Sequence, residues 1–149
     1  MTFLPIDIDE TKNSHFLHEP ECLEILKVFP ELYRKVGFSK PWIGYFVSKD
    51  NVLVGGGGYK GKPKDSRVEI SYGTFKNYEG KGIGTEICTK LVKLSLKTDP
   101  AIKITARNLP DNVASARVLQ KNGFVFTGNV IDPEDGEVLE WEYLNQHTE

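Results

Sequence analysis

The spacing of hydrophobic residues along the chain predicts three helices and seven strands. Apolar side chains recur at helical spacing over residues 20–36 and 82–97, with Pro30 expected to break or kink the first helix. Asp111 or Asn112 can cap a third helix that runs through Asn122, with Gly123 just past its end. Alternating positions and short apolar runs bounded by turn residues predict strands over 2–8, 42–48, 52–59, 67–75, 101–106, 124–131 and 137–144.

The order of these elements predicts an α+β fold. The helix over 82–97 lies between the strands over 67–75 and 101–106, so we expect those two strands to be parallel. Short turns join most other strands, which favours antiparallel pairing. We therefore expect a mostly antiparallel mixed sheet with a central parallel βαβ unit and flanking helices, in a single domain over 1–149. Gly73, inside a predicted strand, indicates a bulge or a close backbone approach.

Charge and cysteine content restrict the class of protein. The net charge is −2 and 27% of the residues are charged, so no basic excess indicates nucleic acid as a partner. The apolar runs are too short to span a membrane. Cys22 and Cys88 are far apart and form no Cys-x-x-Cys pair, which favours two reduced thiols and a cytoplasmic protein.

Three alternating glycines, Gly80, Gly82 and Gly84, join a predicted strand to a predicted helix. Without side chains at these positions, backbone N–H groups can converge at the N-terminus of the helix. The unpaired donors and the helix dipole there suit an anion such as a phosphate. By itself the pattern also fits a flexible turn before an ordinary helix.

Two commoner phosphate-binding motifs are excluded. The dinucleotide fingerprint would need a glycine at position 85 or 87, where Thr85 and Ile87 stand. Residues 56–62 have the P-loop spacing, but Pro63 replaces the Ser or Thr that would hold magnesium, and no helix is predicted to follow. We interpret residues 55–61 as a strand end and hairpin.

Two further runs carry a family resemblance. Residues 79–84 fit the acetyl-CoA signature Gln/Arg-x-x-Gly-x-Gly/Ala of the GNAT superfamily, except for Glu79 in first place. Residues 112–124 match the run Asn-x-x-Ser-x-x-Val-Leu-x-Lys-x-Gly-Phe, typical of the branch with the ribosomal-protein N-terminal acetyltransferases, and residues 68–72 match the same branch. The chain thus resembles GNAT-superfamily N-acetyltransferases.

The resemblance implies a coenzyme A site. The backbone of Tyr72, Gly73, Thr74 and Phe75 would pair with the pantetheine arm as an added strand, and Asn112 and Ser115 would face that arm from the next helix. Glu79 departs from the family pattern, so we expect its side chain to point away while its backbone still contributes. The pyrophosphate would be held by the backbone of the remaining turn residues Gly80, Lys81, Gly82, Ile83, Gly84 and Thr85.

The resemblance also implies catalytic candidates. Glu69 would take a proton from the acceptor amine; alternatively it is a strand glutamate paired with Arg67 or a lysine. Many relatives protonate the leaving thiolate with a tyrosine at the position of Leu119, which cannot donate. Ser115 would then protonate the thiolate, directly or through water. Alternatively, its hydroxyl forms a hydrogen bond with the backbone of its own helix. Asn112 completes the catalytic set.

The remaining site predictions concern the acceptor and metals. Tyr33, Trp42 and Tyr45 lie where relatives build the acceptor pocket, although core packing would explain each of them too. His15 and His18 have no clear third ligand and are interpreted as surface residues, so no metal is expected.

The sequence therefore predicts an acetyl-CoA-dependent N-acetyltransferase, monomeric or homodimeric. It would transfer the acetyl group directly, in a ternary complex, to a primary amine on a protein N-terminus or a small molecule. The alternative is a catalytically silent acyl-CoA-binding or sensing module, which Glu79 and Leu119 motivate. An enzyme would release free coenzyme A when an amine is added, whereas a silent binding module would not.

Overall fold

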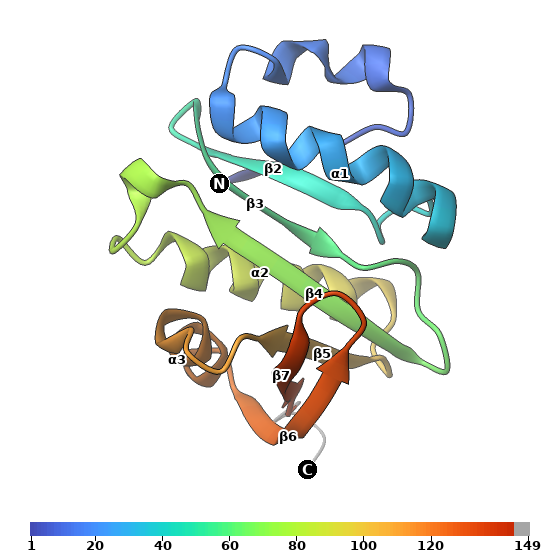
Figure 1. The fold of residues 1–149 in the computed structure, drawn as a ribbon, viewed down its shortest axis with the longest axis vertical. Coiled ribbons are helices and arrows are strands. Elements are labelled where there is room, and N and C mark those ends of the chain that lie inside the picture. The colour runs from blue at the N-terminus through green and yellow to red at the C-terminus, as the bar shows by residue number, and fades with distance from the viewer. Residues whose placement is uncertain (145–149) are drawn as a thin grey trace.

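Seven strands form one mixed sheet in the order β1-β2-β3-β4-β5-β7-β6 (Figure 1). The computed structural model describes residues 1–144. The strands are β1 (Thr2–Pro5), β2 (Gly44–Lys49), β3 (Val52–Tyr59), β4 (Arg67–Thr74), β5 (Lys103–Asn108), β6 (Phe124–Asp132) and β7 (Gly136–Tyr143). The helices are α1 (Pro20–Val36), α2 (Ile83–Thr98) and α3 (Val113–Lys121), with short 3-10 helices η1 (Glu10–Phe16) and η2 (Lys76–Tyr78).

The predicted fold class is confirmed. β4 and β5 are parallel and are joined through α2, whereas the other paired strands are antiparallel. Gly73 pairs with Gly56 in an unshifted register, so it forms no bulge. Pro30 lies inside α1 without ending it, because a proline removes one helical hydrogen bond while the other turns remain paired. The helix η1 was not predicted.

The glycines of β3 allow α2 to pack closely on one face of the sheet. A Cβ atom on Gly57 would lie 2.8 Å from Ile87 Cγ2 in α2, which is a clash. On the other face, a Cβ atom on Gly56 would make only an ordinary contact with α1, at 3.9 Å from Ile25 Cδ1. The four glycines 55–58 therefore lie inside β3 between the two helices, and the turn follows only after Tyr59.

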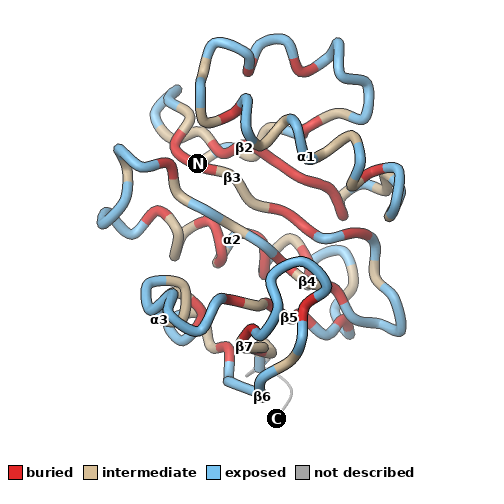
Figure 2. The backbone as a smooth tube through the Cα atoms, in the orientation of Figure 1, coloured by how far each residue is buried: buried red, intermediate tan, exposed pale blue. Residues whose placement is uncertain are grey.

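The inner face of α2 forms the centre of the core. Ile87 and Leu91 have no exposed surface, and Tyr59 Oη donates a hydrogen bond of 2.8 Å to the Leu91 carbonyl. Figure 2 shows the buried segments along the central strands and the helix sides that face them. Cys22 and Cys88 are both buried and unpaired, and burial raises the pKa of each thiol to about 12.

Within residues 1–144, no helix has the length and apolar character needed to cross a membrane.

Candidate functional site

The parallel strands β4 and β5 separate at the middle of the sheet. β5 pairs with β4 only from Arg67 to Ile70, whereas β4 continues to Thr74. The opposite edge of residues 71–74 is paired with β3. In the described chain, the edge of residues 71–74 that faces β5 thus has no partner strand. An extended group can pair with this free edge as an additional strand would.

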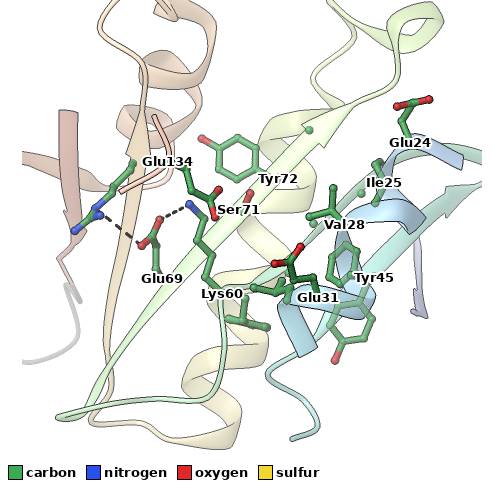
Figure 3. Close-up of a pocket in the computed structure, with 18 of the residues that line it drawn as sticks. Glu24, Ile25, Val28, Glu31, Tyr45, Lys60, Glu69, Ser71, Tyr72 and Glu134 are labelled. Atoms are coloured by element: carbon green, nitrogen blue, oxygen red, sulfur yellow. Dashed lines mark ion pairs between the residues drawn. The ribbon is translucent and has the colours of Figure 1, made fainter. Parts of the chain in front are cut away.

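Two adjoining cavities open at this point. The larger, of about 920 Å³, lies between α1, the strands β2 to β4 and the turn after β6 (Figure 3). The smaller, of about 200 Å³, lies between β4, the end of β5 and α3, and Asn112 and Ser115 line it. The residues that line both cavities are Lys60, Ser71, Tyr72 and Arg107.

The glycine-rich turn leads from β4 to α2. Gly80 and Gly82 have φ angles of 76° and 77°, in the left-handed region that favours glycine, and no atom lies within 4 Å of where their Cβ atoms would be. The helix begins at Ile83, so the first N–H groups have no partner within it. The Ile83 side chain is buried, whereas Glu79 is exposed. This open turn fits a phosphate bound through backbone N–H groups.

Glu69 projects from β4 between two cations. Its Oε2 lies 2.9 Å from Lys60 Nζ, and its Oε1 lies 3.9 Å from Arg107 Nε, as the dashed lines in Figure 3 show. Oε2 is itself shielded from solvent but accepts no hydrogen bond. The short distance to Lys60 is therefore a charge contact with poor hydrogen-bond angles. This oxygen has unused capacity to accept a proton or a donor.

Arg107 is held in place by two further carboxylates. Its Nε donates to Glu140 at 3.0 Å and its Nη1 donates to Asp132 at 3.1 Å. Burial alone would lower the pKa of Arg107, but these hydrogen bonds and the charge of Glu69 raise it. The pKa of Asp132 is lowered, chiefly because the backbone N–H of Glu134 donates to it. The network fixes one side of the Glu69 carboxylate.

Tyr72, Ser115 and Asn112 form a second polar group across the smaller cavity. Tyr72 Oη lies 3.2 Å from Ser115 Oγ and 3.3 Å from the Ser115 carbonyl oxygen. Asn112 Oδ1 accepts a 3.1 Å hydrogen bond from the Ser115 N–H and so caps α3. Burial raises the pKa of Tyr72, and the hydrogen bond with Ser115 opposes this only partly. The hydroxyl therefore remains a proton donor at neutral pH.

The aromatic residues proposed for the acceptor pocket separate into two groups. Tyr45 lines the larger cavity, and its hydroxyl donates to the Pro41 carbonyl at 2.7 Å. Tyr33 and Trp42 are buried and line neither cavity. The Tyr33 hydroxyl bonds two backbone groups near the start of β2, and Trp42 packs edge-on against Tyr59. For Tyr33 and Trp42 the pocket assignment is corrected to core packing.

The other sequence-based assignments are placed as follows. Leu119 is fully buried. The side chain of Phe75 is also buried, and its backbone N–H donates to the Val54 carbonyl at 2.8 Å. Arg67 pairs with Glu140 and Glu142 rather than with Glu69. In residues 1–144, no group of three or more His, Cys, Asp or Glu side chains is arranged to hold a metal ion.

Several residues that line the site were not identified from sequence. Lys60 directly follows β3, and its backbone N–H donates to the Glu69 carbonyl at 3.0 Å, so the register of the predicted hairpin would have located it. Glu24 and Glu31 of α1 line the larger cavity. Their spacing of seven places them on one helix face. Nothing in the sequence indicates that the turn with Glu134 reaches the cavity.

Comparison with known proteins gives this arrangement a family. The family described as the acetyltransferase (GNAT) domain matches residues 14–125. An uncharacterized N-acetyltransferase, YjdG of Bacillus subtilis (strain 168), is 32% identical over 131 residues, which cover 85% of this chain and 74% of that protein.

Solved structures share the fold. A variant of the spermidine N-acetyltransferase SpeG from Vibrio cholerae has a TM-score of 0.69 at 16% identity, covering 97% of this chain and 95% of that one. The ribosomal L7/L12 alpha-N-protein acetyltransferase RimL in complex with coenzyme A has a TM-score of 0.68 at 17% identity, covering 95% and 92%. The aminoglycoside acetyltransferase AAC(6')-Ib, in complex with an aminoglycoside and acetyl-CoA, has a TM-score of 0.61 at 24% identity, covering 70% and 65%. Together with the separated parallel strands and the glycine-rich turn, the family match shows that the chain belongs to the GNAT acetyltransferase family.

Proposed function

We propose that the protein is an N-acetyltransferase that transfers the acetyl group of acetyl-CoA directly to a primary amine in a ternary complex. The observation that carries the proposal is the free edge of β4 at residues 71–74, which lies between two sets of proton-transfer groups. Glu69 lies in the wall of the larger cavity and the Tyr72–Ser115 pair lies in the wall of the smaller one. An amine and a thioester that enter from opposite sides would meet at this edge.

The chain offers a backbone site for the cofactor. The free edge of residues 71–74 suits the amide groups of the pantetheine arm, and the turn over 80–85 suits the pyrophosphate. The exposed Glu79 can point away from the phosphates, as the sequence leads us to expect. Acetyl-CoA supplies the activated acetyl group as a thioester.

Glu69 acts as the general base. A protonated amine must lose a proton before it can attack, and a base within hydrogen-bond reach contributes about 10²- to 10⁴-fold to such a step. Oε2 of Glu69 faces a cationic nitrogen already, that of Lys60, and accepts no hydrogen bond. An acceptor amine that displaces Lys60 would find this oxygen ready to take its proton.

Ser115 protonates the leaving thiolate, and Tyr72 supports it. The Ser115 hydroxyl would donate its proton to the thiolate, and the Tyr72 hydroxyl lies 3.2 Å from Ser115 Oγ, where either hydroxyl can donate to the other. Asn112 has a positioning role, because its side chain accepts a hydrogen bond from the Ser115 N–H and so fixes the start of α3. A backbone N–H near Tyr72 or Gly73 stabilises the charge that develops on the carbonyl oxygen.

The acceptor is a cationic primary amine, on a small molecule or a protein N-terminus. The larger cavity is lined by more carboxylates than cations, with Glu24 and Glu31 of α1 on one side and Glu134 on the other (Figure 3). By name, SpeG acetylates spermidine and RimL acetylates a ribosomal protein. The match of residues 112–124 to the ribosomal-protein branch supports a protein N-terminus as the acceptor, whereas the acidic cavity supports a small cationic amine.

We also propose a cytoplasmic, single-domain protein that is monomeric or homodimeric. The two buried, unpaired thiols support a reducing compartment.

The test is thiol release from acetyl-CoA with a panel of small amines and N-terminal peptides. The proposal requires that at least one amine accelerates release. Tight binding of acetyl-CoA with no amine-dependent release would instead identify a silent acyl-CoA-binding module.

A further inference from the structure

Lys60 places a primary amine of the chain itself inside the site. It follows β3 directly, and its backbone N–H donates to the Glu69 carbonyl at 3.0 Å. Its side chain lines both cavities, and Nζ lies 2.9 Å from Glu69 Oε2. Figure 3 shows the Lys60 ammonium group beside the carboxylate of Glu69. The Lys60 side chain is 42% exposed, so it retains freedom to change its rotamer.

The nitrogen of Lys60 lies where an acceptor amine would lie. A general base has to be within about 2.6–3.2 Å of the nitrogen from which it takes a proton, and the Lys60–Glu69 distance is within that range. The contact lacks hydrogen-bond geometry, and Oε2 accepts no hydrogen bond from any other described group. Lys60 is therefore held near the base by charge alone and is not locked by a directional bond.

We propose that Lys60 is an internal acceptor, acetylated on Nζ by the acetyl-CoA bound to the same chain. The inference rests on the proposed function, because it uses the same base and the same cofactor edge. It adds a modification site and a self-directed activity to that function.

The reaction balances with acetyl-CoA as the only co-reactant. Glu69 takes one proton from the Lys60 ammonium, and the neutral nitrogen attacks the thioester carbonyl carbon. The C–N bond forms, the C–S bond breaks, and the nitrogen gives up a second proton as the amide forms. One proton leaves on the coenzyme A thiol, by way of Ser115, and the other passes to solvent. The products are Nε-acetyl-Lys60 and free coenzyme A.

Neighbouring lysines show why this position would be selected. Lys62 and Lys64 are on the same turn but line neither cavity. Lys35 lines the larger cavity from α1, where it pairs with Glu31 at 3.8 Å, and it does not line the smaller cavity. Of these four lysines, Lys60 alone reaches both the base and the cavity assigned to the pantetheine arm.

The experiment incubates the purified full-length protein with acetyl-CoA and no acceptor amine, and follows acetylation of each lysine by peptide mass spectrometry. We expect Lys60 to be acetylated at least about tenfold faster than Lys62 and Lys64, which report uncatalysed acetylation at the same pH. Glu69→Gln should slow acetylation of Lys60 by about 10²-fold and leave Lys62 and Lys64 unchanged. The rate constant should not change when the protein is diluted, because donor and acceptor belong to one chain.

A uniform rate across these lysines, no effect of Glu69→Gln, or a rate that falls on dilution would each overturn the inference. Lys60→Arg provides a matched control, because it keeps a cation beside Glu69 and removes the reactive amine. It should lose modification at position 60, while Lys62 and Lys64 are acetylated at their wild-type rates.

A parallel assay of amine-dependent thiol release separates this inference from the proposed function. Release by an added amine with Lys60 unmodified would overturn the internal acceptor and keep the acetyltransferase. Absence of both thiol release and Lys60 acetylation would overturn both.

Discussion

Replacing Glu69 with glutamine tests the base and leaves the shape of the site nearly intact. The side chain keeps its size, so the cavity and the β4 backbone stay as they are. The change removes the charge that faces Lys60 Nζ at 2.9 Å and Arg107 Nε at 3.9 Å. It also removes the oxygen that can take a proton from the acceptor.

The expected effect on rate is much larger than the effect on stability. A general base contributes about 10²- to 10⁴-fold, which corresponds to about 2.7–5.4 kcal/mol in the barrier. The lost ion pair with Lys60 is partly exposed, at 42% for Lys60 and 20% for Glu69. Such pairs contribute about 0–1 kcal/mol because water screens them. Turnover should therefore fall by two orders of magnitude or more while the protein remains folded.

The assay is steady-state thiol release against pH, with acetyl-CoA affinity measured by calorimetry. In Glu69→Gln we expect a low kcat at every pH and an almost unchanged Kd for acetyl-CoA. Glu142→Gln is the matched control, because Glu142 also pairs with an arginine, Arg67 at 3.5 Å, but lines neither cavity. Wild-type rates at all pH values in Glu69→Gln would refute the role of this residue.

Three further predictions follow from the structure. Gly82→Val should remove backbone contacts to the phosphate, each worth about 1.5–3 kcal/mol, and raise the Kd for acetyl-CoA by about 10- to 150-fold. Gly37→Val, which also has a positive φ (85°) but lies outside the site, should not raise this Kd. In thiol-release and denaturation assays, Tyr72→Phe should lower kcat severalfold and stability by about 1 kcal/mol. Tyr59→Phe, which loses a more deeply buried hydroxyl contact, should change only stability; equal kcat values would exclude a role for the Tyr72 hydroxyl. Burial raises the pKa of Tyr33 from 10.0 to about 12, so as pH rises the unfolded chain loses this proton before the folded chain does. The free energy of unfolding should therefore fall between pH 10 and 12, and it should fall by less in Tyr33→Phe. Denaturant titrations at each pH would measure both changes.

Local patterns were sufficient to predict most of the fold. The helical period over 20–36 and the alternation over 67–75 predict bounds close to those of α1 and β4, because one face of each element is buried. The connection through α2 correctly implied a parallel pair. The helix η1 was missed because its seven residues are mostly polar and exposed, so no hydrophobic period marks them.

The site was only partly predictable, because its side chains meet across distant segments. Binding through the backbone at the glycine-rich turn depends on local conformation, which the alternating glycines indicate. The contacts of Glu69 depend instead on register, and the sequence did not specify whether Lys60 or another cation would face it. The same limit applies to Tyr33 and Trp42, since whether an aromatic residue fills the core or a pocket depends on what packs around it.

The most direct test of the account is release of coenzyme A thiol from acetyl-CoA by the purified protein, with and without an amine acceptor. We predict saturable release that depends on the amine, increases with pH and is lost in Glu69→Gln. Tight acetyl-CoA binding without thiol release for any amine, at any pH, would contradict the central claim that this site transfers acetyl groups.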